Sequence, residues 1–303
     1  MKLRTILLLT ALLPVSLRAD EWRPLLDADL SLWDIYMGVP HKSTKVEGYT
    51  HKEGTDHMSG VAIGLGKDPL GVFKVVEEDG QPVLHISGEI YAGLSTKEEF
   101  ENYHLSMEFK WGDKKWPPRE NTKRDSGILF HCVGEHGAFW KVWMRSLEFQ
   151  VQENDCGDFI PLAGTAASIP VGPYGYLNQK QAVYSPDGTL FSNTNYTQHG
   201  PSKENDHGEW NLLELYTVGD RAIFVVNGTP NMALFDTAQK GPEGKGLVAL
   251  TKGKIQLQSE AAEVFYRDIK LRPISSFPEE FEKFTTRPEG AVTKWDPPKE
   301  ESK

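Results

Sequence analysis

The feature that most constrains the fold is a succession of short apolar or alternating runs, separated by Gly, Pro, Asn and Asp, that continues along the chain after residue 19. No long segment with helical periodicity interrupts these runs. Alternation with a period of two residues is typical of strands that bury one face. The pattern therefore predicts an all-β protein, a two-sheet antiparallel β-sandwich. The candidate strands are 83–87, 103–111, 127–133, 147–152, 211–218, 222–226, 253–258 and 264–271.

Two tight turns are expected in one of the sheets. The segment 218–221 carries Gly219 and Asp220 between two apolar runs, and Asn227-Gly228 forms the next step of the same type. Such pairs favour two-residue hairpin turns, so residues 210–231 are predicted to form a meander. Residues 155–209 look loop-like and hold several Tyr, Pro and Gly. A stretch of this length without structure is usually a binding or active-site loop.

The two ends of the chain differ in composition from the middle. Residues 1–19 combine Lys2 and Arg4 with a short apolar run, which predicts a signal peptide and an exported protein, periplasmic or secreted. The run is too short to cross a bilayer, so no transmembrane segment is expected. Residues 20–274 are predicted to form one domain. Residues 275–303 are rich in Pro, Glu and Lys, and we expect a tail that wraps the surface or is disordered.

Charge and cysteine content exclude several classes of function. The chain has 33 Lys and Arg against 43 Asp and Glu, a net charge of -10, which opposes attraction to nucleic acid phosphates. Cys132 and Cys156 are too few for a disulfide scaffold or a cysteine-based metal site. A bridge between them and two buried free thiols remain open alternatives.

A polar row follows the candidate strand 147–152. Because alternate strand residues share a face, Glu148, Gln150 and Gln152 point one way and the apolar residues between them point into the core. Such a row is often the solvated outer face of an antiparallel sheet. The segments beside it favour a binding site instead.

These neighbouring segments carry the side chains that bind sugars. Arg124 and Asp125 precede the strand at 127–133, and Trp140, Trp143 and Arg145 precede the polar row. Aromatic rings stack on sugar faces, while amide, carboxylate and guanidinium groups pair with hydroxyls. The combination predicts a carbohydrate site.

Histidines have two interpretations in this sequence. His131 lies on a candidate strand, where a lone histidine is more often structural than catalytic, but next to a Glu row it could form an acid-base pair. The histidines at 41, 51, 57, 199 and 207 lack the spacing of a metal site and are interpreted as solvated loop residues. No metal ligand set and no cofactor motif is apparent, although a structural calcium on a loop is compatible with this type of sandwich.

Several segments together resemble the bacterial 3-keto-disaccharide hydrolase domain family. The matching segments, in family order, are 24–33, 93–96, 103–111, 125–131, 147–150, 208–211, 226–228, 253–258 and 265–269. The resemblance implies a concanavalin A-like, laminarinase-like jelly roll with a concave carbohydrate-binding face. Its site positions correspond to Arg124–Gly127, His131, Glu148, Gln150 and Gln258. The chain has Gln258-Ser259-Glu260 where the family often has Gln-Asp-His, which adds Glu260 to the group.

The residue types in the row constrain the reaction. Ordinary glycosidases use two carboxyl groups, whereas the row offers one acid and two amides. A ketone at C3 acidifies the C2 proton and allows base-assisted elimination of the C1 substituent, for which one base and one acid suffice. We therefore expect Glu148 and His131 to exchange protons with a 3-keto-glycoside, while Arg124, Gln150 or Gln258 binds it. A non-catalytic carbohydrate-binding module and an ordinary endo-glucanase are the alternatives.

Overall fold

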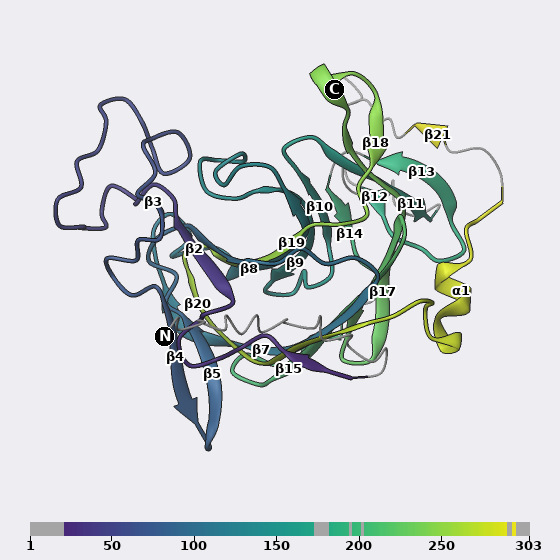
Figure 1. Ribbon diagram of the computed structural model, residues 1–303, viewed down its shortest axis with the longest axis horizontal. Coiled ribbons are helices and arrows are strands. Elements are labelled where there is room, and N and C mark those ends of the chain that lie inside the picture. Colours follow the sequence, from purple (N-terminus) through teal and green to yellow (C-terminus); the bar gives the residue numbers. More distant parts are fainter. Residues whose placement is uncertain (1–20, 173–181, 194–195, 201–202, 290–292, 295–303) are drawn as a thin grey trace, which may run out of the picture.

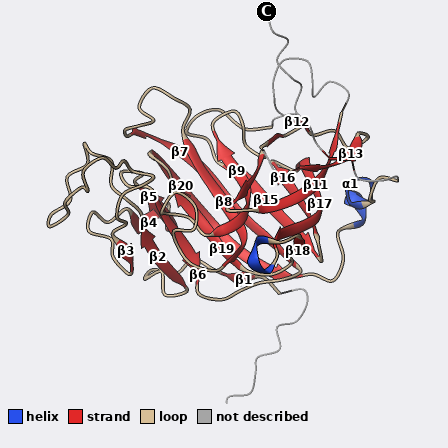
Figure 2. Cartoon of the chain, turned by 90° about the horizontal axis from the view of Figure 1, so that it is seen from above, coloured by secondary structure: helices blue, strands red, loops and turns tan. Residues whose placement is uncertain are grey.

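The computed structural model describes residues 21–172, 182–193, 196–200, 203–289 and 293–294. Two sheets lie one over the other across this part of the chain (Figures 1 and 2). Almost all neighbouring strands pair in antiparallel fashion, and the exceptions are short strands at the edges. The predicted β-sandwich is confirmed.

We call the two layers the large sheet and the small sheet. The large sheet has the order β21 (Thr293–Lys294), β13 (Thr189–Asn193), β11 (Thr165–Val171), β17 (Thr229–Lys240), β16 (Arg221–Val226), β15 (Asn211–Val218), β7 (Tyr103–Lys115), β20 (Ala262–Pro273), β5 (Gln81–Ile86) and β4 (Phe73–Glu78), with β1 (Arg23–Pro24) beside β20 and β18 (Leu247–Ala249) beside β17. The small sheet has the order β12 (Ala182–Val183), β14 (Thr197–Gln198), β10 (Phe159–Leu162), β9 (Arg145–Gln152), β8 (Asp125–Val133), β19 (Lys254–Ser259), β6 (Ala92–Thr96), β2 (Trp33–Met37) and β3 (Gly64–Leu65).

The core lies between the sheets and is built from alternate strand residues. Leu147, Phe149 and Val151 of β9 are fully buried there, as the period of two predicts. Phe149 stacks on Phe224 of the large sheet, with ring centroids 4.4 Å apart. Burial of each such side chain contributes roughly 2 kcal/mol to stability. Glu148, Gln150 and Gln152, which alternate with these core residues, therefore lie on the opposite face of β9.

The predicted strands and turns agree with the structure. Each of the candidate runs contains a strand, and Val218 pairs with Arg221 across the first predicted turn. Val226 pairs with Thr229 across the second, where Asn227 and Gly228 have φ of 48° and 74°. Positive φ at both central residues is what an Asn-Gly turn of this type requires.

The interpretation of residues 155–209 as a loop is wrong. This stretch supplies β10 to β14, which extend both sheets. The clearest case is β11, whose sequence TAASIPV contains two alanines and a proline, residue types that are depleted in strands. Pairing with β17 and β13 and burial along its whole length override that weak local preference.

The C-terminal segment packs on the large sheet as far as it is described. A short turn η3 (Glu279–Phe281) and helix α1 (Glu282–Thr285) bring Phe281 and Phe284 onto Tyr216 and Ile223. The other short turn, η2 (Pro242–Gly244), joins β17 to β18. The predicted signal peptide, residues 1–19, lies outside the described residues. None of the helices among the described residues is long and apolar enough to cross a membrane.

The two cysteines are buried and unbridged. Cys132 lies on β8 and Cys156 in the turn before β10, and both are free thiols. Of the two alternatives left open by the sequence, the structure shows the pair of buried thiols.

Candidate functional site

The polar row of β9 is buried rather than solvated. Glu148 and Gln150 each expose 3% of their surface. Gln152 donates its side-chain N–H to Asp125 Oδ2 at 2.6 Å, across the pairing of β8 with β9. The interpretation as a solvated outer face is therefore wrong. Burying a carboxyl or amide group costs free energy unless the group is hydrogen-bonded, so a buried polar row indicates a functional or structural role.

An arginine that the sequence analysis missed organises this face. Arg119, from the loop after β7, forms ion pairs with Asp125 and, at 2.9 Å, with Glu260. Tyr91 also hydrogen-bonds to this guanidinium. We call Arg119, Asp125, Glu148 and Glu260 the carboxyl cluster. No local motif identifies Arg119, since its loop follows two prolines and only the fold brings it to Glu260.

Burial favours the protonated form of the carboxyl groups in the carboxyl cluster. Burial, followed by the neighbouring Glu260 and Asp125, raises the pKa of Glu148 well above its usual range. Burial also raises the pKa of Asp125 and brings that of Glu260 to about 7, while Arg119 opposes both shifts. One guanidinium lies beside three buried carboxyl groups. Glu148 forms no ion pair with it, so Glu148 is the group most favoured to stay protonated.

Several polar atoms of this face have no protein partner in the described part of the chain. They are Oδ1 of Asp125 and the amide oxygens of Gln150 and Gln258. Buried acceptors are normally hydrogen-bonded, and the donors that would complete these are hydroxyl groups of the kind a sugar offers. Gly127 leaves room for this arrangement, because a Cβ there would occupy the space of the Glu148 and Gln258 side-chain ends.

His131 is not part of this face, and the prediction that it pairs with Glu148 is wrong. Its ring lies in the core, 5.2 Å from the ring of Phe130 and 6.1 Å from that of Tyr103 on the large sheet. Neither ring nitrogen has a hydrogen-bond partner among the described residues, and burial lowers the pKa of His131 to about 3. The cause is a shift in the β8–β9 register between Phe130 and Val133, with φ of 50° at His131, which interrupts the alternation of faces.

The two other predicted cations are also engaged elsewhere. Arg124 pairs with Glu153 at 2.8 Å and donates to the Gly112 carbonyl at 3.0 Å. Arg145 donates to the carbonyl of Ala163 at 3.0 Å. Both brace the ends of strands, so the substrate-binding roles expected for them have no support from these contacts.

The predicted tryptophans form an aromatic group beside the carboxyl cluster. Trp143 is buried, donates to the Ala92 carbonyl at 3.2 Å and stacks on Tyr91, with centroids 5.7 Å apart. Trp140 lies 5.7 Å from Trp143 and is 41% exposed. Trp143 thus supports Tyr91, whereas Trp140 offers a face to which a ligand could bind.

Two histidines interpreted as solvated are packed near polar groups instead. His57 contacts the Tyr91 ring edge-on at 5.0 Å, and burial lowers its pKa. His199 Nδ1 lies 2.5 Å from Asp158 Oδ1 and its side chain is 12% exposed. Within the described residues, no group of three or more His, Cys, Asp or Glu has an arrangement that could hold a metal ion.

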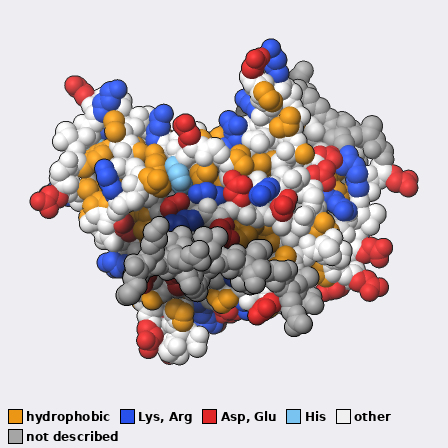
Figure 3. Space-filling view, in the orientation of Figure 1, with side chains coloured by type: hydrophobic (Ala, Val, Ile, Leu, Met, Phe, Trp, Pro, Cys, Tyr) orange, Lys and Arg blue, Asp and Glu red, His pale blue; other side chains and the backbone are white. Residues whose placement is uncertain are grey.

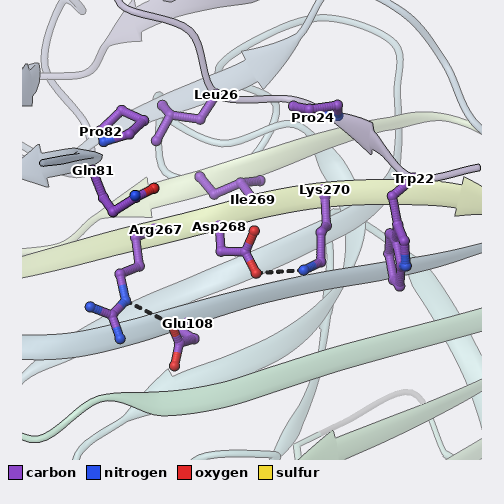
Figure 4. Close-up of a pocket in the computed structure, with 10 residues that line it drawn as sticks. All are labelled: Trp22, Pro24, Leu26, Gln81, Pro82, Glu108, Arg267, Asp268, Ile269 and Lys270. Carbon is purple, nitrogen blue, oxygen red and sulfur yellow. Dashed lines mark hydrogen bonds and ion pairs between the residues drawn. The ribbon is translucent and has the colours of Figure 1, made fainter.

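A separate hollow of about 360 Å³ lies on the outer face of the large sheet (Figure 4). Its charged side chains are already paired, Arg267 with Glu108 at 2.6 Å and Lys270 with Asp268 at 2.5 Å. It therefore lacks the unpaired polar atoms of the carboxyl cluster. Basic and acidic side chains are interspersed on the face of the molecule shown in Figure 3, without a single-sign patch for a polyanion.

Comparison with known proteins gives the family. Similar solved structures include a candidate glycosyl hydrolase from Parabacteroides distasonis, 18% identical over 84% of this chain and 100% of that chain, with a TM-score of 0.45. The carbohydrate binding module CBM66 from Bacillus subtilis is 7% identical over 66% of this chain and 91% of that chain, with a TM-score of 0.38. No curated protein matches the chain. The sequence profile described as the 3-keto-alpha-glucoside-1,2-lyase-like domain matches residues 21–272. The chain therefore belongs to the family of 3-keto-alpha-glucoside-1,2-lyase-like, or 3-keto-disaccharide hydrolase, domains.

Proposed function

We propose that the chain is an exported enzyme that cleaves 3-keto-glycosides by elimination across C1 and C2. The observation that carries the proposal is the carboxyl cluster, in which a buried and protonated Glu148 lies beside amides with unpaired oxygens. Membership of the family supports the substrate class. Export rests on the composition of residues 1–19.

The reaction needs a proton acceptor at C2 and a proton donor at the leaving oxygen. A base removes the C2 proton, the electrons of that C–H bond form the C1=C2 double bond, and the C1–O bond breaks with its electrons on the leaving oxygen. Glu148, protonated through burial, donates a proton to that oxygen. The amide groups of Gln150 and Gln258 polarise the C3 ketone and accept hydrogen bonds from hydroxyls. Water then adds to the unsaturated ketone.

Ordinary glucan hydrolysis fits this face less well. A retaining glycosidase needs an ionised carboxylate as nucleophile opposite an acid. The carboxyl groups of Asp125 and Glu260 are bound by Arg119, and the row beside Glu148 continues with amides. A glucan with an intact C3 hydroxyl has no acidified C2 proton, so the proposed site gives it no route to cleavage.

Carbohydrate binding without catalysis is the second candidate, and the exposed face of Trp140 favours it. The two functions are separated by incubating the purified protein with a 3-keto-disaccharide and with its unoxidised parent, with and without a chelator, and measuring sugar release by mass. The proposed enzyme cleaves only the keto form. Saturable binding of the sugars without any product would refute cleavage and favour the binding module.

A further inference from the structure

Asp158 holds His199 in one orientation. The carboxylate of Asp158, 1% exposed, accepts the backbone N–H of His199 at 2.7 Å and lies 2.5 Å from Nδ1 of the same residue. The hydroxyl of Tyr196 donates to its other oxygen. A carboxylate accepts from Nδ1–H, so this geometry selects the tautomer of the neutral ring that carries its proton on Nδ1 and its lone pair on Nε2.

Backbone pairing places this group beside the polar row. The N–H of Gln150 donates to the Asp158 carbonyl at 3.0 Å, and the N–H of Gly157 donates to the Gln150 carbonyl at 2.9 Å. Gly157 and Asp158 thus both oppose Gln150, in a bulge that needs the φ of 105° at Gly157. Because Phe159 pairs with Phe149 in the core, Asp158 lies on the same face as Gln150. Opposed residues have Cβ atoms about 5 Å apart.

Arg119 binds the carboxyl groups of Asp125 and Glu260, and Glu148 is assigned as the acid, so removal of the C2 proton calls for another group. We propose that His199 Nε2 is the group that removes the C2 proton, with Asp158 as the residue that positions the ring; this rests on the proposed function. The proton moves from C2 to Nε2, and the C–H electrons enter the C1=C2 bond. The C1–O electrons leave with the oxygen that Glu148 protonates. Gln150 opposes Asp158 and lies two residues from Glu148 on β9, so the proposal places the sugar ring over Gln150.

A purely structural role for the same contacts predicts different behaviour. Asp158 also ties the segment after β14 (Thr197–Gln198) to the turn before β10. If these contacts were only structural, their loss would affect folding and substrate binding together. It would not specifically slow removal of the C2 proton. The test must therefore follow the C2 proton itself and not activity alone.

The experiment uses His199→Gln, Asp158→Asn and the control His207→Gln in the full chain. His207 lies in the same part of the chain but pairs at 3.2 Å with the exposed Asp113. Each protein is incubated in D₂O with a 3-keto-glycoside, and both cleavage and deuterium at C2 of recovered substrate are measured. We expect His199→Gln to lose about 10²–10⁴-fold in kcat with little change in KM and to abolish enzyme-dependent exchange at C2. Asp158→Asn should lower kcat less and shift the pH profile, while His207→Gln behaves as the unmodified protein.

The outcomes separate the two proposals. Cleavage and C2 exchange that persist in a folded His199→Gln variant would overturn the role of His199 and leave the proposed function standing. Absence of both from the unmodified protein would refute the proposed function, and His199 would lose its role with it. Added imidazole gives a second readout, because partial recovery of exchange in His199→Ala supports a missing base and lack of recovery at full binding argues against it.

Discussion

Replacement of Glu148 by Gln removes one transferable proton from the site with almost no change in side-chain shape. The side chain is 3% exposed, and Gln258 provides its neutral hydrogen-bonding neighbour. Glutamine has the volume of a protonated glutamic acid but cannot release a proton. Loss of a general acid costs about 10²–10⁴-fold in kcat, or about 3–5 kcal/mol of activation free energy. We expect a loss in this range with KM nearly unchanged.

The same substitution has a predicted effect on stability, and its sign follows from the raised pKa. Below the unfolded value near 4.5, Glu148 is protonated in both states and contributes no difference. As pH rises, the unfolded chain ionises first, so the buried carboxyl lowers the free energy of unfolding progressively through its raised folded pKa. Glu148→Gln removes this penalty. Relief on the order of 1 kcal/mol would raise Tm by about 2–4 °C at pH 9 and leave it unchanged at pH 4.

The assay is cleavage of a 3-keto-glycoside at several pH values, combined with thermal unfolding of the same samples. Glu153→Gln is the matched control, since Glu153 pairs with Arg124 outside the carboxyl cluster. Wild-type turnover in a folded Glu148→Gln variant would refute the assignment of Glu148 as the acid. A Tm that falls more steeply with pH in the variant than in the unmodified protein would refute the reasoning from burial.

Three further substitutions test other parts of the account. Arg119→Met should destabilise the fold by about 3–5 kcal/mol at neutral pH, because Asp125 and Glu260 lose the guanidinium that pairs with both of them, and chemical denaturation at pH 5 and pH 8 should show a smaller loss at the lower pH. His131→Phe should retain cleavage and change stability by less than about 1.5 kcal/mol, since the ring has no polar partner among the described residues; loss of activity in a folded variant would contradict its core position. Gly127→Ala should preserve the fold but reduce kcat, because the added methyl would displace the carboxyl end of Glu148 and the amide end of Gln258. An unchanged kcat would show that the positions of these two groups do not matter for cleavage.

The sequence predicts the sandwich well because its strongest strands alternate regularly. In β9 the period of two identifies both the buried apolar side and the polar row of Glu148 and Gln150. The same rule fails at His131, where a bulge after Phe130 turns the side chain into the core. Bulges arise from how two strands pair, so one strand alone does not reveal them.

The rest of the site depends on contacts between distant segments. Arg119 reaches Glu260 across 141 residues, and His199 reaches Asp158 across 41. Neither pair has a local motif, and both lie in segments that look like loops from their composition. Strand β11 was missed for a related reason, because its small residues are held by β17 and not by their own preference.

The most direct test of the account is the mass of the first product released from a 3-keto-glycoside. Elimination by Glu148 and its partner base gives a sugar lighter by one water than the hydrolysis product, and hydration converts it later. The account predicts that this unsaturated sugar appears before the hydrated one, and that the unoxidised parent gives neither. Release of the hydrated sugar as the first product, with its original C2 hydrogen retained in D₂O, would contradict it.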